Sequence, residues 1–152
     1  MSEESQQFAI QKVYLKDASF ESPRAPQVFT SGEMQPQVNV QINSKSAAIG
    51  ESVYEVVLQV TVTATVDEAT AFLVEVQQAG IFTLAGFSEE NLSGMLGAYC
   101  PETLFPFARE VVADLITKGG FPQLLLAPVN FNNLYAEQLQ KQQVATGQDT
   151  AH

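Results

Sequence analysis

Side chains that could carry out covalent chemistry are scarce in this chain. Its single histidine, His152, is the last residue, and its single cysteine, Cys100, stands between Tyr99 and Pro101. Nucleophilic catalysis of the Ser/His/Asp or Cys/His kind needs an imidazole base held close to the nucleophile. A terminal histidine is poorly placed for that role, and a cysteine in this setting is more typical of a small buried apolar residue. The sequence therefore argues against a nucleophilic enzyme.

Sites for metals and cofactors are not expected either. One cysteine and one terminal histidine leave only carboxylates as metal ligands, and these are spread along the chain. The nine glycines form neither a dinucleotide-binding fingerprint nor a phosphate-binding loop. Two carboxylate pairs, at residues 67–68 and 89–90, are more simply explained as a turn and a helix start. One alternative remains, a small enzyme or ligand-binding protein with an apolar pocket and a working carboxylate such as Glu75.

The charge distribution favours some partners over others. The formal net charge is -10, and the chain has no Lys or Arg between Lys45 and Arg109. Nucleic acid and anionic lipid are bound mainly through Lys and Arg, so both are poor candidate partners. The longest apolar runs, such as residues 124–127, fall far short of the roughly 20 residues that cross a bilayer. With one cysteine and an acidic, polar start, we expect a cytoplasmic protein with a single domain over residues 1–152.

Alternation of apolar and polar residues with a period of two predicts the strands. It is clearest over residues 52–66 and 38–42, continues over 71–78, and shifts its phase within 8–20, where we expect a bulge. Helices are predicted over residues 88–96, 101–118 and 131–144, with Ser88 as an N-cap and Gly119 and Gly120 ending the second. Residues 1–7 and 146–152 are expected to be flexible. Strands followed by helices predict an α+β fold with an antiparallel sheet.

Two apolar stretches stand out because they are predicted as loops. Residues 81–87 and 121–129 carry aromatic and aliphatic side chains, and the second stretch contains two prolines. Loops usually run over the surface, so these side chains could line a groove for apolar ligands. Alternatively, both stretches pack over the sheet or the helices and complete the core. On the residues alone, the second explanation is the simpler one.

Five blocks of sequence together resemble a known family. They are YLKDASFE at residues 14–21, VYEVVLQVTVT at 53–63, AFLVEVQQAGIF at 71–82, LGAYCP at 96–101 and FPQLLLAPVNF at 121–131. They resemble the SecB family of protein-export chaperones, over about residues 8–135. The resemblance implies a four-stranded antiparallel sheet with two main C-terminal helices, assembled as a homotetramer that is a dimer of dimers. It also implies ATP-independent binding of unfolded precursor polypeptides, which are kept translocation-competent and delivered to the ATPase SecA.

With that resemblance, the apolar stretches are expected to line a groove for unfolded clients. The candidate groove residues lie on one strand, on the stretch 81–87 and before the last helix: Val38, Val40, Ile42, Phe82, Leu84, Phe87, Phe121, Leu124 and Leu126. The positions that the family implies for the integrity of the tetramer are Val74, Val76 and Gln78.

The resemblance also implies contact with SecA through Asp17, Glu21, Leu73 and Glu75. Residues two or four apart in a strand share a face, so Asp17 and Glu21 should point the same way, as should Leu73 and Glu75. Leu73 would then point away from the apolar face of its strand. An isolated exposed leucine among solvated acids is the ordinary alternative. A further hypothesis for the whole chain is an oligomeric scaffold without clients.

Overall fold

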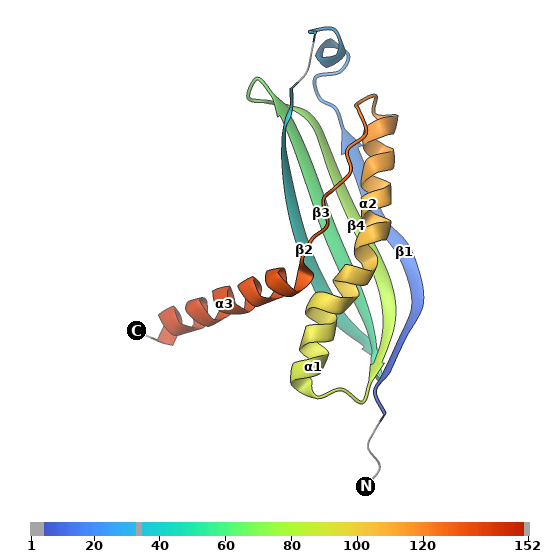
Figure 1. The fold of residues 1–152 in the computed structure, drawn as a ribbon, viewed down its shortest axis with the longest axis vertical. Helices are drawn as coiled ribbons and strands as arrows, with labels where there is room; N and C mark the ends of the chain where they lie inside the picture. The colour runs from blue at the N-terminus through green and yellow to red at the C-terminus, as the bar shows by residue number, and fades with distance from the viewer. Residues whose placement is uncertain (1–4, 33–34, 151–152) are drawn as a thin grey trace.

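The structure, a computed structural model, describes residues 5–32 and 35–150 (Figure 1). Its strands pair into one antiparallel sheet in the order β1-β4-β3-β2. This sheet and two longer helices, α2 and α3, confirm the predicted α+β fold. Residues 1–4 and 151–152 of the predicted flexible ends lie outside the described residues, and so does the terminal His152. In chain order the elements are β1 (Gln7–Glu21), the 3-10 turn η1 (Gln27–Phe29), β2 (Gln37–Gly50), β3 (Val53–Val66), β4 (Ala69–Ala85), α1 (Glu89–Gly94), the π-helical stretch η2 (Met95–Tyr99), α2 (Cys100–Lys118) and α3 (Phe131–Thr150).

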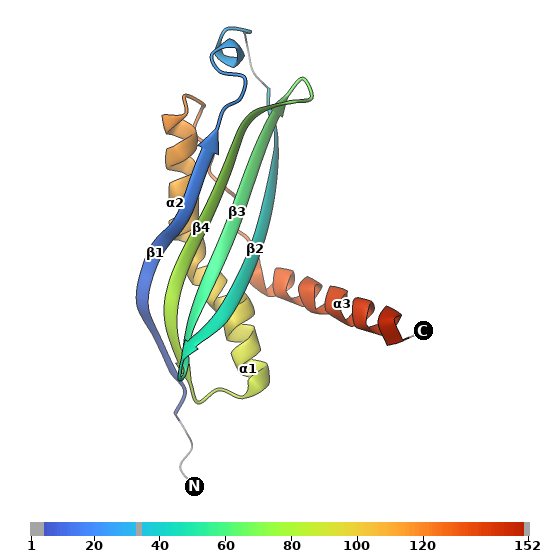
Figure 2. The same ribbon diagram turned by 180° about the vertical axis from the view of Figure 1, so that it is seen from behind.

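The sheet has two different faces. The helix α2 lies along one of them, here called the inner face, and Figure 2 shows the opposite, outer face with the strands in front. Side chains alternate between the faces along each strand. The inner face and α2 bury the core, which includes Val56, Val60, Val62, Val74, Val76, Leu104, Ala108, Val112 and Ile116.

Two bulges bend the edge strand β1. Its pairing with β4 shifts between Ile10 and Lys12 and again between Leu15 and Asp17. Each bulge inserts one extra residue, so the inward side chains change from even to odd positions and back again. The phase shift in the sequence is thereby explained, and the predicted bulge is confirmed.

The strand β4 is longer than predicted. It continues through Gly80 to Ala85, so the prediction of a loop beginning at residue 81 is wrong. Phe82 and Leu84 are consequently buried on the inner face. A Cβ atom at Gly80 would lie 2.8 Å from the Phe82 ring and 3.0 Å from the Leu104 side chain of α2. This glycine therefore allows the helix to pack closely on the sheet and does not end the strand.

The helices predicted over residues 88–96 and 101–118 form one continuous helical run. The Ser88 side chain accepts a hydrogen bond of 3.2 Å from the Asn91 amide, which confirms the predicted N-cap. α1 passes through η2 directly into α2 without a break. Gly97 in η2 is required by packing, because a Cβ atom there would overlap the Tyr135 ring of α3.

An irregular segment connects α2 to α3. Gly119 and Gly120 end α2 as predicted, and residues 121–129 then return beside α2 and across the sheet (Figure 1). α3 packs against η2 near its start and points away from the rest of the molecule (Figures 1 and 2). It continues to Thr150, beyond the predicted end at Val144. Of the helices in the described residues, none combines the length and the apolar character of a membrane span.

Candidate functional site

An apolar cavity lies between the inner face of the sheet and the segment 121–129. Its volume is about 220 Å³. Sites for drug-sized ligands usually have about 300 to 1,000 Å³, so this cavity is better matched to single side chains. None of the described residues that line it is charged. These residues are Pro36, Val38, Val66, Ala71, Phe72, Phe121, Pro122 and Leu124.

Phe121 holds the irregular segment beside the cavity. Its ring centroid lies 4.8 Å from that of Phe72, 5.0 Å from that of Phe29 and 6.3 Å from that of Phe20, and only 6% of the residue is exposed. The chain turns into this position at Gly120, whose φ of +89° is strained for residues with a side chain. The aromatic cluster therefore fixes one wall of the cavity.

Three of the predicted groove residues, Val38, Phe121 and Leu124, meet at this cavity. Val40 and Ile42 follow Val38 on the inner side of β2, because each lies two residues further along the strand. Val38 and Val40 are 42% and 39% exposed, although both are apolar. β2 is an edge strand of the sheet. We call the cavity together with Val38, Val40 and Ile42 the apolar groove.

The other predicted groove residues lie elsewhere. Phe82, Leu84 and Leu126 are buried in the core and do not line the cavity. Phe87 is half-buried and lines a separate hollow of about 570 Å³ at the start of α3. In the single chain these four residues do not share one opening with Val38. Their contact with a client stays a prediction.

Sequence reasoning missed several residues that line the cavity. Periodicity places Phe72 on the inner face, but it does not reveal which neighbours that side chain meets. The lining comes from distant parts of the chain, and only the strand order and the path of the irregular segment bring them together. The missed residues are Pro36, Val66, Ala71, Phe72 and Pro122.

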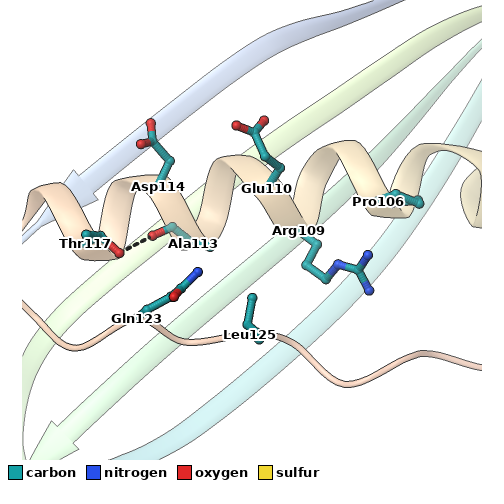
Figure 3. Close-up of a pocket in the computed structure, with 8 residues that line it drawn as sticks. All are labelled: Pro106, Arg109, Glu110, Ala113, Asp114, Thr117, Gln123 and Leu125. Atoms are coloured by element: carbon teal, nitrogen blue, oxygen red, sulfur yellow. Dashed lines mark hydrogen bonds between the residues drawn. The ribbon is translucent and has the colours of Figure 1, made fainter.

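Another hollow, of about 490 Å³, lies between α2 and the irregular segment 121–129 (Figure 3). Leu125 borders it and is 68% exposed. Glu110 and Asp114 point away from the segment, whereas Arg109 extends on the other side of the helix (Figure 3). The Arg109 guanidinium carbon lies 5.8 Å from the centroid of the Phe105 ring. The charged groups therefore do not converge on a common point, as they would in an acid–base site.

The four residues predicted to contact SecA share one end of the outer face. Glu21 pairs with Leu73 across the β1 and β4 strands, and Ser19 pairs with Glu75. Asp17, Glu21 and Glu75 are exposed, and Leu73 is half-buried. The register thus gives these residues the common face that their spacing predicts. The contact with SecA stays a prediction.

A polar cluster nearer the other end of the outer face was not predicted. The Tyr14 hydroxyl donates a hydrogen bond to the Glu55 carboxylate, and Lys16 Nζ lies 3.0 Å from both carboxylate oxygens. These hydrogen bonds, that of Tyr14 first, lower the pKa of Glu55. Burial, together with the Glu55 carboxylate, raises the pKa of Tyr14 to about 12. The cluster was hard to find because Lys16 is a bulge residue, and alternation does not predict its direction.

The residues implied for tetramer integrity point inward. Val74 and Val76 are fully buried. Gln78 is 4% exposed, and its side-chain nitrogen donates a hydrogen bond of 3.0 Å to the Tyr14 carbonyl oxygen. In the single chain these side chains support the sheet under α2. Their role in assembly stays a prediction.

The thiol of Cys100 is buried. Burial raises the pKa of the Cys100 thiol to about 12, so the reactive thiolate is disfavoured. Within residues 5–32 and 35–150, no three His, Cys, Asp or Glu side chains are grouped so that they could hold a metal ion.

Comparison with known proteins decides the family. Residues 1–142 match the family described as "Preprotein translocase subunit SecB". The chain belongs to the SecB family. The protein named "Protein-export protein SecB" from Nitrosococcus oceani is 58% identical, over 99% of this chain and 94% of that protein. The SecB proteins of Hydrogenovibrio crunogenus and Methylococcus capsulatus are 56% and 51% identical, over 97% and 100% of this chain and the whole of each relative.

A solved structure shows the same fold as this SecB-family chain. It is a SecB-like chaperone from Mycobacterium tuberculosis in complex with a ChAD peptide from an antitoxin. The TM-score is 0.66 at 18% sequence identity, and the match covers 80% of this chain and 90% of the other. The four-stranded sheet with its helices is therefore a SecB-like fold.

Proposed function

We propose that this SecB-family protein is an ATP-independent molecular chaperone. It binds unfolded precursor polypeptides, keeps them competent for translocation and delivers them to SecA. The observation that carries the proposal is the apolar groove, which leaves Val38 and Val40 exposed beside an uncharged cavity. Unfolded chains expose apolar side chains that native proteins bury, so such a groove selects the unfolded state.

The geometry of the groove fits an extended client. The cavity accepts one client side chain, and Val40 and Ile42 contact the next ones along β2. Side chains on one face of an extended chain recur every two residues, or about 6.6 Å, which is also the spacing of Val38, Val40 and Ile42. Contacts of this kind depend on apolar area and little on sequence. We therefore expect affinity to follow how slowly a client folds.

The acidic end of the outer face is the proposed docking surface for SecA. Asp17, Glu21 and Glu75 surround the half-buried Leu73 there. Changing any of the three acids to Lys should weaken SecA binding, most at low salt, since such charges govern mainly encounter and specificity. Leu73→Gln tests the apolar part of the contact. If all four variants stay assembled and bind SecA like the parent, this surface is wrong.

The proposed assembly is a homotetramer, a dimer of dimers, that acts in the cytoplasm. Both sheet edges, β1 and β2, end the sheet without a further strand in the described residues, and open edges invite pairing with another copy. Phe107 of α2 and Leu125 are exposed apolar residues that a second layer would cover. Light scattering with size-exclusion chromatography at micromolar concentration measures the mass, and a monomer would contradict this assembly.

One assay separates the chaperone from the other hypotheses. A chemically denatured protein is diluted into buffer, and its aggregation is followed by light scattering with and without this chain. Suppression without nucleotide supports the chaperone, whereas no effect favours a scaffold or a ligand-binding protein. The enzyme alternative has no specific support, because Glu75 lies on the outer face and the cavity lies on the inner one. We infer that the protein is not an enzyme.

A further inference from the structure

The charges on the outer face are separated into two ends. At one end, the described outward positions of the strands carry Asp17, Glu21 and Glu75 and neither Lys nor Arg. At the other end lie Lys12, Lys16 and Lys45, all exposed. They account for three of the seven Lys and Arg residues in a chain whose net charge is -10.

The sheet register places the three lysines around one carboxylate. Lys12 of β1 and Glu55 of β3 pair with the same residue of β4, Ile81, from opposite sides. Lys45 of β2 pairs with Val57, which lies two residues from Glu55 on β3. Lys16 forms an ion pair of 3.0 Å with Glu55. Both Lys16 and Lys45 contribute to lowering the pKa of Glu55.

The lysine end keeps a positive excess. Glu55 is engaged by Lys16 and by the Tyr14 hydroxyl. Within the described residues, neither Lys12 nor Lys45 forms an ion pair. Lys12 and Lys45 therefore remain available to an outside partner, and the next acid at this end is the exposed Glu51 in the turn between β2 and β3. We call Lys12, Lys16 and Lys45 the basic pole, and Asp17, Glu21 and Glu75 the acidic pole.

Uncharged polar residues separate the poles on the central strands. Glu75 and Ile81 are six positions apart on β4, which corresponds to about 20 Å at a rise of 3.3 Å per residue. Gln77, Gln59 and Asn43 form one row across β4, β3 and β2 between these two positions, and on β1 the same row ends at Asp17, next to Lys16. This distance is about twice the Debye length in 0.1 M salt, so Glu75 and Lys12 can attract different groups of one partner independently, whereas the two poles adjoin at Asp17 and Lys16 on β1.

We propose that the outer face is a two-pole docking surface. It fits a folded polypeptide surface that has a basic region over the acidic pole and an acidic region over the basic pole, in that order along the strands. The proposal rests on the proposed docking of SecA to the acidic pole and adds a second contact. Two opposite poles set the direction in which the partner lies along the strands, because a reversed partner brings like charges together at both ends.

The test is the charge-reversing double variant Lys12→Glu/Lys45→Glu, with SecA as the probe. Its affinity for SecA is measured by isothermal titration calorimetry in low salt and in about 0.15 M salt, where the Debye length is about 8 Å. We expect binding to weaken on the order of tenfold in low salt and still measurably at the higher salt. Lys16 is left unchanged, because its ion pair with Glu55 also supports the fold.

Two controls distinguish a local contact from a general charge effect. Lys118→Glu makes the same type of charge reversal on α2, where Lys118 pairs with Asp114 at 2.9 Å. It should leave SecA affinity at the higher salt unchanged. Glu75→Lys reports separately on the acidic pole. Assembly and client binding of every variant are checked by light scattering and by aggregation suppression.

The outcomes separate this inference from the docking proposal beneath it. If Glu75→Lys weakens binding and Lys12→Glu/Lys45→Glu does not, the basic pole is no contact and only this inference is overturned. If Lys118→Glu weakens binding as much as the double variant, the effect is general charge and the inference is again overturned. If neither Glu75→Lys nor the double variant changes binding, the outer face is not the docking surface and both proposals fail.

Discussion

Replacing Val38 and Val40 together by Thr tests the apolar groove directly. Thr has nearly the shape of Val and the same branching at Cβ, so the strand should persist. Each substitution exchanges a methyl group for a hydroxyl, and loss of one buried methyl-sized group costs about 0.8 kcal/mol. If a bound client covers both positions, the variant should lose about 1.6 kcal/mol of binding free energy, or about 15-fold in Kd. Burying the hydroxyls without partners would enlarge this loss.

The assay uses a short extended peptide with one large apolar side chain, because a long client touches several sites and masks a local loss by avidity. Fluorescence anisotropy of the labelled peptide gives Kd. The matched control is Asn39→Thr/Gln41→Thr, which changes the same strand on its opposite face and should leave Kd unchanged. Val38 and Val40 are already about 40% exposed, so folding stability should change little. Equal affinity of Val38→Thr/Val40→Thr and the parent would refute the groove.

Three further predictions concern stability at a fixed protein concentration. Glu55→Gln should flatten the acid side of the curve of unfolding free energy against pH. Because folding lowers the pKa of Glu55, its carboxylate stabilises the fold above the usual pKa of 4.5, and this stabilisation is lost as the pH falls through the folded pKa. Urea titrations at several pH values measure the effect. In Gly119→Ala the new Cβ atom overlaps the Phe20 ring, so the free energy of unfolding should fall by about 1 to 3 kcal/mol. Gly94→Ala has open space around the new atom and should stabilise the fold slightly. Thermal melts compare the two variants. Phe121→Ala should cost about 3 to 5 kcal/mol in urea unfolding, and a much smaller loss would contradict its anchoring role.

Local patterns were sufficient to predict most of the fold. Alternation located the four strands, and the first bulge of β1 was visible as a change of phase between Ile10 and Val13. The errors occurred at glycines. The loop predicted from residue 81 begins just after Gly80, and the gap between the first two predicted helices begins at Gly97, whereas each of these glycines provides space for a side chain from a distant element. A glycine required by close packing and a glycine in a loop look the same in one sequence.

The candidate site was less accessible to prediction. Val38 was found because its strand alternates, and Phe121 and Leu124 because so apolar a segment with two prolines is unusual. Their meeting at one cavity depends on how the segment 121–129 crosses the sheet, which no local pattern specifies. The Tyr14 and Glu55 contact spans 41 positions in the chain and crosses a third strand, so only the register reveals it.

The alternation within β4 constrains how this molecule can change over time. Leu73 and Glu75 face outward while Phe72, Val74 and Val76 support the core, so a point substitution alters one surface and leaves the other intact. Deletion of a single codon in this stretch would have a different result. It would turn an acid toward the helix and a valine toward solvent along the remainder of the strand. Single-residue gaps should therefore be absent from the central strands of viable variants, whereas substitutions at outward positions can accumulate without cost to the interior.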